Sequence, residues 1–440
     1  MHSVHSGLSV IAKLRSDKIE SARNYLKELN KDPGYNSKIP FSKSQNIHFV
    51  TGVIIPEQDY HGKILPATLF FATSFSGPRN DHINELISFG SEGLRGLFQS
   101  CIGFPEEAKT SDEALRKFIK KHRRWDTFYT GMQFISHTDV VRENELRNSI
   151  EDFIDERQKL KTFDTLKPAE IRKRIQEFVK SRSEYSWALK PVKKSFMDFI
   201  VLDLPFYIVS ALILIILVSF VGYIINSSLI FLPGFIIFLF LMIFLSVLLL
   251  SIRNYEKQKQ FQSPRQTDTH VKAVSETQNH PVINEMSVFG PFKKGKLRPL
   301  YYYFALKAVN LIRGTLIVPT VATARWLTTD GGKRLVFISN FTNLSESYVR
   351  DFIDNKSSAA KINLLFGQAN GYPITKWLTG DGALTDPNTF MNSVIQNQQI
   401  TEFWYCPYKN LNIDNININH KIRQGLFADL SEFEIRKWLR

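Results

Sequence analysis

Cysteine is almost absent from this sequence, which has only Cys101 and Cys406 among its 440 residues. Two cysteines argue against a disulfide framework and against a cysteine-based metal site. The N-terminus has no continuous apolar stretch of the kind found in secretory signals. We therefore expect the first domain to remain on the side of the membrane where it is synthesised.

Nucleic-acid-binding motifs are missing as well, although the formal net charge is +14. The sequence contains no helix-turn-helix, zinc-finger or RNA-recognition pattern, and no compact basic run interleaved with aromatics, so nucleic acid is not an expected partner. It also lacks a phosphate-binding loop, a Ser/His/Asp order, zinc-ligand spacing and a prominent carboxylate pair. Excess positive charge is also common beside membranes, where it attracts anionic lipid head groups.

Two long apolar runs dominate the middle of the chain. Residues 204–225 and 229–252 contain no charged residue and are separated by Asn226, Ser227 and Ser228. At 1.5 Å per residue, a helix of about 22 residues spans the ~30 Å hydrocarbon core of a bilayer. A soluble core helix is rarely apolar on all sides over two consecutive runs. We therefore predict a transmembrane hairpin that acts as an anchor, since neither run holds an ionisable residue for transport.

Basic residues flank this hairpin at both outer ends, whereas its turn is uncharged. The flanking residues are Lys190, Lys193, Lys194, Arg253, Lys257 and Lys259. Because positive loops stay in the cytoplasm, we expect two passes with both soluble domains on the cytoplasmic side.

The parts on either side of the hairpin resemble each other in sequence. Residues 69–77 (LFFATSFSG) match residues 335–343 (LVFISNFTN), and the pair at 128–129 matches the pair at 404–405. An ordered series of matches indicates two copies of one unit.

Hydrophobic periodicity predicts the order β-α-β-β-α-β in each copy. In the first copy the expected elements are residues 5–14, 16–30, 47–56, 67–75, 80–99 and 127–134. In the second copy they are residues 286–292, 297–312, 321–329, 334–341, 345–368 and 401–407. A further helix is expected after each copy, at 139–155 and 416–430. The predicted fold class is α+β, with two ferredoxin-like βαββαβ repeats that pair as a pseudo-dimeric α/β barrel around the hairpin insertion.

The predicted domain organisation has five parts. They are the first repeat (1–160), a basic amphipathic connector (161–198), the hairpin (199–253), a flexible linker (254–285) and the second repeat (286–440). The helix expected at 168–182 in the connector has an apolar side that could lie on the membrane or pack on the first domain. The linker is predicted to be flexible because it is polar and poor in aromatics.

Short segments of both copies carry a resemblance to a known family. They are Ile47-His48-Phe49 with Ala322-Thr323-Ala324-Arg325-Trp326, Ser74-Phe75-Ser76-Gly77 with Asn340-Phe341-Thr342-Asn343, and the turns Gly103-Phe104-Pro105 and Gly371-Tyr372-Pro373. They resemble an uncharacterised bacterial family of membrane-associated tandem ferredoxin-like proteins in the dimeric α/β-barrel superfamily. That family carries a His-Phe-Ala-Arg-Trp strand, a Leu-Leu-Phe strand ending in Asn-Tyr-Asp-Gly, and a Gly-Tyr-Pro turn. Here Ser76 and Thr342 replace the acidic residue. The resemblance implies the fold and a bacterial inner-membrane location.

The same superfamily contains haem enzymes, among them dye-decolourising peroxidases and chlorite dismutases. The resemblance therefore implies a haem or another planar ligand between the sheets, with His48 as the iron ligand. The Gly-x-x-Asp-Gly loop of the peroxidases has no recognisable counterpart here. Thr329-Asp330-Gly331-Gly332 is expected to be a hairpin turn, which favours Asp-Gly for backbone reasons alone.

Two residues are the main candidates for chemistry. His48 begins a central strand and could ligate iron, act as an acid–base group, or be an ordinary hydrogen-bonded strand-end histidine. Arg325 lies in the equivalent strand of the second copy among apolar neighbours. A buried arginine needs an anionic partner, which could be a ligand carboxylate or an Asp or Glu of the protein.

Other polar residues at matched or terminal positions complete the set of candidates. Tyr129, Tyr405 and Asn340 are further ligand-binding candidates, whereas His137 and His420 are expected at the surface.

Two functional hypotheses follow from these predictions. In the first, the protein is a membrane-anchored binding or scaffold module that holds a small hydrophobic or lipidic ligand between its repeats. In the second, it is a haem-dependent or cofactor-free oxidoreductase, similar to a peroxidase, that acts on a hydrophobic substrate.

Overall fold

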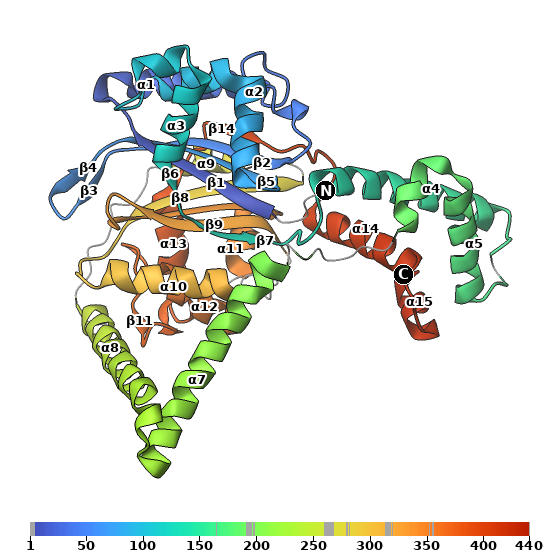
Figure 1. Cartoon of the computed structure of the whole chain (residues 1–440). Helices are drawn as coiled ribbons and strands as arrows, with labels where there is room; N and C mark the ends of the chain where they lie inside the picture. Colours follow the sequence, from blue (N-terminus) through green and yellow to red (C-terminus); the bar gives the residue numbers. More distant parts are fainter. Residues whose placement is uncertain are drawn as a thin grey trace.

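The computed structural model contains two five-stranded antiparallel sheets that pack face to face, with helices outside them and a long helical hairpin at one end (Figure 1). It describes residues 5–163, 165–190, 196, 199–258, 268–278, 280, 282–312, 318, 320–351, 353 and 356–439. The predicted α+β class and the predicted apolar helix pair are confirmed.

The first sheet is built mainly from residues that precede the hairpin. In spatial order it contains β14 (Phe403–Tyr405), β2 (Ile47–Ile55), β5 (Thr68–Ser76), β1 (His5–Lys13) and β6 (Arg123–Arg124). Its outer face is covered by α1 (Ile19–Asn30), α2 (Arg79–Phe98) and α3 (Asp112–His122). Alternate residues of β1, such as Leu8 and Val10, point into the core under these helices, as the two-residue period of a strand requires.

The second sheet is built mainly from residues that follow the hairpin. In spatial order it contains β13 (Gln398–Gln399), β8 (Ile283–Pro291), β10 (Arg334–Thr342), β9 (Val321–Thr329) and β7 (Thr127–Thr130). Its outer face is covered by α10 (Arg298–Ile312), α11 (Ser345–Asp351), α12 (Lys356–Phe366) and α13 (Pro387–Asn397). The single helix predicted at 345–368 is therefore two helices, α11 and α12.

The two sheets exchange one edge strand each. Strand β7 was assigned to the first copy but pairs with β9, where Tyr129 lies opposite Ala324. Strand β14 belongs to the second copy but pairs with β2, where Trp404 lies opposite Thr51. Our assignment of both segments to their own copies was wrong, because an open sheet edge accepts any extended segment and periodicity does not identify the partner. The two-residue strands β6 and β13, which we did not predict, pair with β1 and β8.

Four helices form a bundle beside the sheets (Figure 1). They are α4 (His137–Lys159), α5 (Pro168–Ser181), α14 (Ile413–Leu426) and α15 (Glu432–Trp438). The apolar side of α5 packs into this bundle, where Ile175 and Val179 are buried with Leu146 and Leu426. Of the two alternatives for the connector helix, the structure therefore supports packing against protein.

The hairpin consists of α7 (Leu204–Asn226) and α8 (Leu232–Glu256), joined through Ser227 in the left-handed region. Residues 204–226 and 229–256 form two helices that are long and apolar enough to cross a membrane. No residue of α7 is buried. Lys193, Lys194 and Lys259, which we used to predict sidedness, lie outside the described residues.

The last turns of α8 are fixed to the second sheet's helical layer. Leu248 and Ile252 pack with Tyr302 and Leu306 of α10. The Glu256 carboxylate accepts hydrogen bonds from the Thr375 hydroxyl at 2.7 Å and from the Trp377 and Leu378 amides at 3.1 and 2.9 Å.

Part of the predicted flexible linker is ordered. Helix α9 (Asp268–Thr277) buries Val274, and His270 contacts the Gln398 carbonyl at 3.0 Å; residues 259–267 lie outside the described part. Two small hairpins complete the fold. They are β3 (Gln58–Tyr60) with β4 (Lys63–Leu65), and β11 (Thr375–Lys376) with β12 (Gly380–Asp381).

Candidate functional site

The space between the sheets has an apolar part and a polar part. The apolar part includes Ile11 and Phe70 from the first sheet and Phe289 and Ile338 from the second. We call the polar part the polar layer. Its members, all buried, are Ser9, Ser74, Asp126, Glu285, Ser287 and Arg325. Burying this many polar groups is costly unless their hydrogen bonds are satisfied, so their partners decide what the layer can do.

Arg325 is at the centre of the polar layer and joins the two sheets. It lies on β9 and donates hydrogen bonds to β1 and β5 of the other sheet. The acceptors are the carbonyl oxygens of Leu8 and Thr73 and the hydroxyls of Ser9 and Ser74, at 2.7–3.1 Å. Its guanidinium lies 3.6 Å from the Asp126 carboxylate, which also accepts from Ser9 at 2.8 Å. Burial lowers the pKa of Arg325, and Asp126 opposes that shift. The anionic partner left open by the sequence is therefore Asp126.

Two further carboxyl groups are buried, and one of them, Glu285, lies near this arginine. Glu285 accepts hydrogen bonds from Ser287 at 2.6 Å and from the Thr401 hydroxyl. Glu402 accepts from the Ile54 amide at 2.9 Å and is paired with the Arg23 guanidinium. Burial raises the pKa of each carboxyl to about 7. Both can therefore change protonation near neutral pH.

A second group of polar rings, which we call the histidine cluster, contains His5, His48, His137 and Tyr408. His48 is fully buried, with Nδ1 2.6 Å from the Tyr408 hydroxyl and Nε2 2.7 Å from the Ser76 hydroxyl. The His5 ring stacks on it at 4.1 Å, and the His137 ring lies 6.2 Å away. Burial lowers the pKa of all three histidines, that of His5 to about 4, so the cluster is neutral at pH 7.

The histidine cluster does not fit haem. Both ring nitrogens of His48 already have hydrogen-bond partners, and its faces are packed, so neither nitrogen can reach an iron without displacing Tyr408 or Ser76. Within the described residues, no group of three or more His, Cys, Asp or Glu side chains is arranged to hold a metal ion. The structure thus places His48 as a buried histidine whose two ring nitrogens are both hydrogen-bonded.

The other three candidates are not gathered around His48 or Arg325. The Tyr129 hydroxyl accepts from the Val318 amide at 2.7 Å, in the core outside the second sheet. Tyr405 packs on Phe41 at 5.7 Å, in the core outside the first sheet. Asn340 accepts a hydrogen bond from the Trp404 indole at 2.9 Å. Each of these side chains has a local structural partner.

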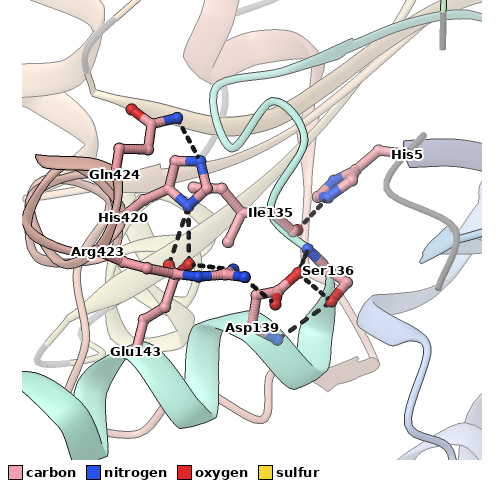
Figure 2. A network of polar contacts seen from close by, with 8 residues as sticks. All are labelled: His5, Ile135, Ser136, Asp139, Glu143, His420, Arg423 and Gln424. Carbon is pink, nitrogen blue, oxygen red and sulfur yellow. Dashed lines mark hydrogen bonds and ion pairs between the residues drawn. The ribbon is translucent and has the colours of Figure 1, made fainter. Parts of the chain in front are cut away.

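His420 is buried, contrary to our expectation of a surface position, because it faces another helix (Figure 2). Only 7% of it is exposed, and its Nδ1 lies 2.9 Å from the Glu143 carboxylate. Arg423 pairs with the same carboxylate at 3.0 Å and with Asp139 at 3.1 Å. This network fastens α14 to α4. His137, also expected at the surface, is half-buried at the edge of the histidine cluster.

An apolar cavity lies on the other side of the second sheet, under α11, α12 and α13. It measures about 50 Å³ and is lined mainly by carbon, including Val288, Phe337 and Ile362. A groove of about 680 Å³ between α9, α11 and α13 adjoins it. Cavity and groove share three lining residues, Met286, Val349 and Val394.

Several residues of these sites were missed from the sequence. Glu285 had a usable signal, since it is a carboxylate within an apolar strand. Asp126, His5 and Tyr408 had none, because their partners lie far away along the chain.

No protein-family model, no curated protein and no solved structure matches this chain.

Proposed function

We propose that the protein is a membrane-anchored binding module that holds an apolar, lipid-like chain beside its second sheet. The observation that carries this proposal is the apolar cavity and the groove that adjoins it. In this proposal the ligand lies outside the second sheet rather than between the repeats, because the space between the sheets is filled by packed side chains and by Arg325 and its partners.

The chemistry of the lining favours an apolar ligand. The Tyr348 hydroxyl is bonded to Ser339 at 2.8 Å, and the Tyr372 hydroxyl to Asn363 at 2.8 Å, so these groups already have partners. Ligand pockets are usually apolar with a few polar groups that set orientation. A cavity of about 50 Å³ holds the end of a chain rather than a planar macrocycle, and the groove has room for the rest.

Strand order supports two ferredoxin-like repeats as the scaffold. Within each copy the strands lie in the order fourth, first, third, second, as β6-β1-β5-β2 and β13-β8-β10-β9. That antiparallel order, with two helices on one face, agrees with a βαββαβ repeat.

The hairpin supports membrane anchoring, and its flanks support a cytoplasmic position for both sheets. Lys190 precedes the first span, while Arg253 and Lys257 lie at the end of the second. Basic residues at the outer ends of a hairpin favour the cytoplasmic side.

Binding of a fluorescent fatty acid to the purified protein in detergent tests the ligand proposal. Val394 lines both cavity and groove, so Val394→Phe should weaken binding by about tenfold, or 1.4 kcal/mol. Val141→Phe, on the exposed side of α4, is the matched control and should leave binding unchanged. Equal binding by all three proteins, or none by the wild type, would exclude the proposed site; circular dichroism would confirm that the variants fold.

A further inference from the structure

Helix α10 is apolar on two opposite faces. One face is buried against the second sheet and α8. Its residues are Arg298, Tyr301, Tyr302, Ala305 and Leu306. The other face is exposed and follows the same three-to-four-residue spacing. Its residues are Leu300, Tyr303, Phe304, Lys307, Ala308 and Ile312.

The exposed face lacks the charge expected of a helix that faces water. Tyr303 is 49% exposed and Phe304 44% exposed. Of the six exposed residues of α10, only Lys307 carries a charge. A helix on the surface of a soluble domain normally carries polar residues on its outer side. An outer face of this kind is typical of a helix in a membrane interface.

The position of α10 agrees with that environment. It lies across the open end of the V formed by α7 and α8 (Figure 1). Phe304 contacts Phe244 of α8, with ring centroids 5.8 Å apart. The exposed face is therefore continuous with the surface of the two apolar helices.

Aromatic residues paired with cations extend this surface on both sides. Trp125, 42% exposed, lies under Lys307, whose Nζ is 3.9 Å from the ring centroid. Trp377, 53% exposed, has the Arg253 guanidinium 5.7 Å from its ring. Tryptophan and tyrosine gather at the boundary between water and lipid, where long cations reach phosphate groups.

We propose that the exposed face of α10, together with Trp125 and Trp377, lies in the head-group region of the bilayer that α7 and α8 enter. We call this surface the α10 face. The proposal rests on the membrane anchoring put forward above, and its occupant is the lipid interface itself. The second sheet then sits directly on the membrane, held by the hairpin and by a third, interfacial helix.

Spin labels on the full-length protein in nanodiscs of phosphatidylethanolamine and phosphatidylglycerol test this proposal. Labels are introduced by Tyr303→Cys and Phe304→Cys. Leu239→Cys in α8 reports the bilayer interior, and Lys117→Cys on α3 reports water. The native thiols interfere little, because Cys101 is buried and burial raises the pKa of Cys406 to about 12. We expect residues 303 and 304 to be more accessible to oxygen than to a water-soluble nickel chelate, at a depth shallower than residue 239.

Three results would overturn the proposal. If labels at residues 303 and 304 have the same accessibility to oxygen and nickel as the label at residue 117, the α10 face lies in water, although α7 and α8 can still span the membrane. If both are shielded from oxygen and nickel alike, another protein or a second copy covers the face. If the label at residue 239 is also as accessible to the nickel chelate as the label at residue 117, α8 does not enter the bilayer and the proposed membrane anchoring is contradicted as well.

Tryptophan quenching provides a second measurement that needs no introduced cysteine. Lipids brominated near the head group should quench Trp125 and Trp377. The quenched fraction should fall in the variants Trp125→Phe and Trp377→Phe. It should rise slightly in Trp438→Phe, because Trp438 packs in the helical bundle and its removal takes away unquenched fluorescence. Equal quenching in all variants would contradict the proposal.

Discussion

At the scale of single residues, the polar layer decides how the two sheets align. Arg325 extends from the second sheet to four acceptors on the first and to Asp126. A sheet shifted by one residue would lose this set of bonds, and an uncompensated buried charge costs about 3–5 kcal/mol. We therefore interpret the layer as a device that fixes the register between the sheets.

Glu285 makes the stability of the protein depend on pH. Burial raises its pKa to about 7 in the folded state, against 4.5 as the ordinary value. Between these pH values the folded chain holds a proton that the unfolded chain has lost, so this contribution to stability falls as pH rises from 4.5 to 7. The Glu285→Gln variant has no carboxyl group at this position, so this dependence of its stability on pH is absent. From pH 5 to pH 8, the wild type should lose stability relative to this variant by about 3 kcal/mol at most.

Urea unfolding in detergent, followed by tryptophan fluorescence at both pH values, measures this difference. Glu145→Gln, an exposed residue of α4, serves as the control and should track the wild type. If the difference in free energy of unfolding between Glu285→Gln and the wild type is the same at both pH values, the prediction is contradicted.

The sequence predicted only part of the candidate site. That Arg325 would be buried and paired was predictable, because an arginine among apolar strand residues has few other options. Asp126 as its partner was not, since the two are 199 positions apart in sequence and meet only when the sheets pack. The same applies to His48 and Tyr408, which come from different copies.

At the scale of elements, the C-terminal end of α8 should stabilise the segment of residues 375–378. Glu256 accepts hydrogen bonds from Thr375, Trp377 and Leu378 and pairs with Arg253. Glu256→Ala leaves two amides and a hydroxyl without their acceptor, each worth about 1 kcal/mol or more. We expect hydrogen exchange at residues 375–378 to become about 10- to 100-fold faster.

Exchange measured by mass spectrometry in detergent checks this prediction. Lys257→Ala alters the next, exposed residue and should leave the loop protected. If both variants exchange like the wild type, Glu256 does not couple α8 to the second sheet.

Most elements could be predicted from periodicity to within a few residues, including β2, β10 and both apolar helices. The sheets with which β7 and β14 pair could not be predicted. Both sheets have an open edge, and a short strand contains no residue that specifies which edge it will pair with. The helix α9 was missed because it carries few apolar residues, and Val274 alone is buried.

At the scale of the whole molecule, strand exchange ties the two halves together by backbone pairing. Thr130 of β7 lies opposite Thr323 of β9. Directly opposed residues in an antiparallel pair have Cα atoms about 4.5–5.5 Å apart, which suits a disulfide. Thr130→Cys combined with Thr323→Cys should therefore cross-link under mild oxidation, and mass spectrometry of digested protein should detect the joined peptides.

The control combines Thr130→Cys with Val10→Cys. Val10 of β1 lies opposite Arg123 of β6 in the first sheet. This second pair should stay unlinked. Absence of a cross-link between positions 130 and 323 under the same oxidation would refute the exchange.

The position of β14 also sets the order in which the chain matures on the ribosome. Phe403 follows Glu256 by 147 positions, so at about 5–20 residues per second, roughly 7–30 s separate their synthesis. Throughout that time β2 has an unpaired backbone edge, although the hairpin has already emerged. A nascent chain interrupted before Phe403 keeps this edge of β2 unpaired, and an unpaired strand edge can pair with a neighbouring chain. The edge of β2 is therefore completed only after residues 403–405 have been made.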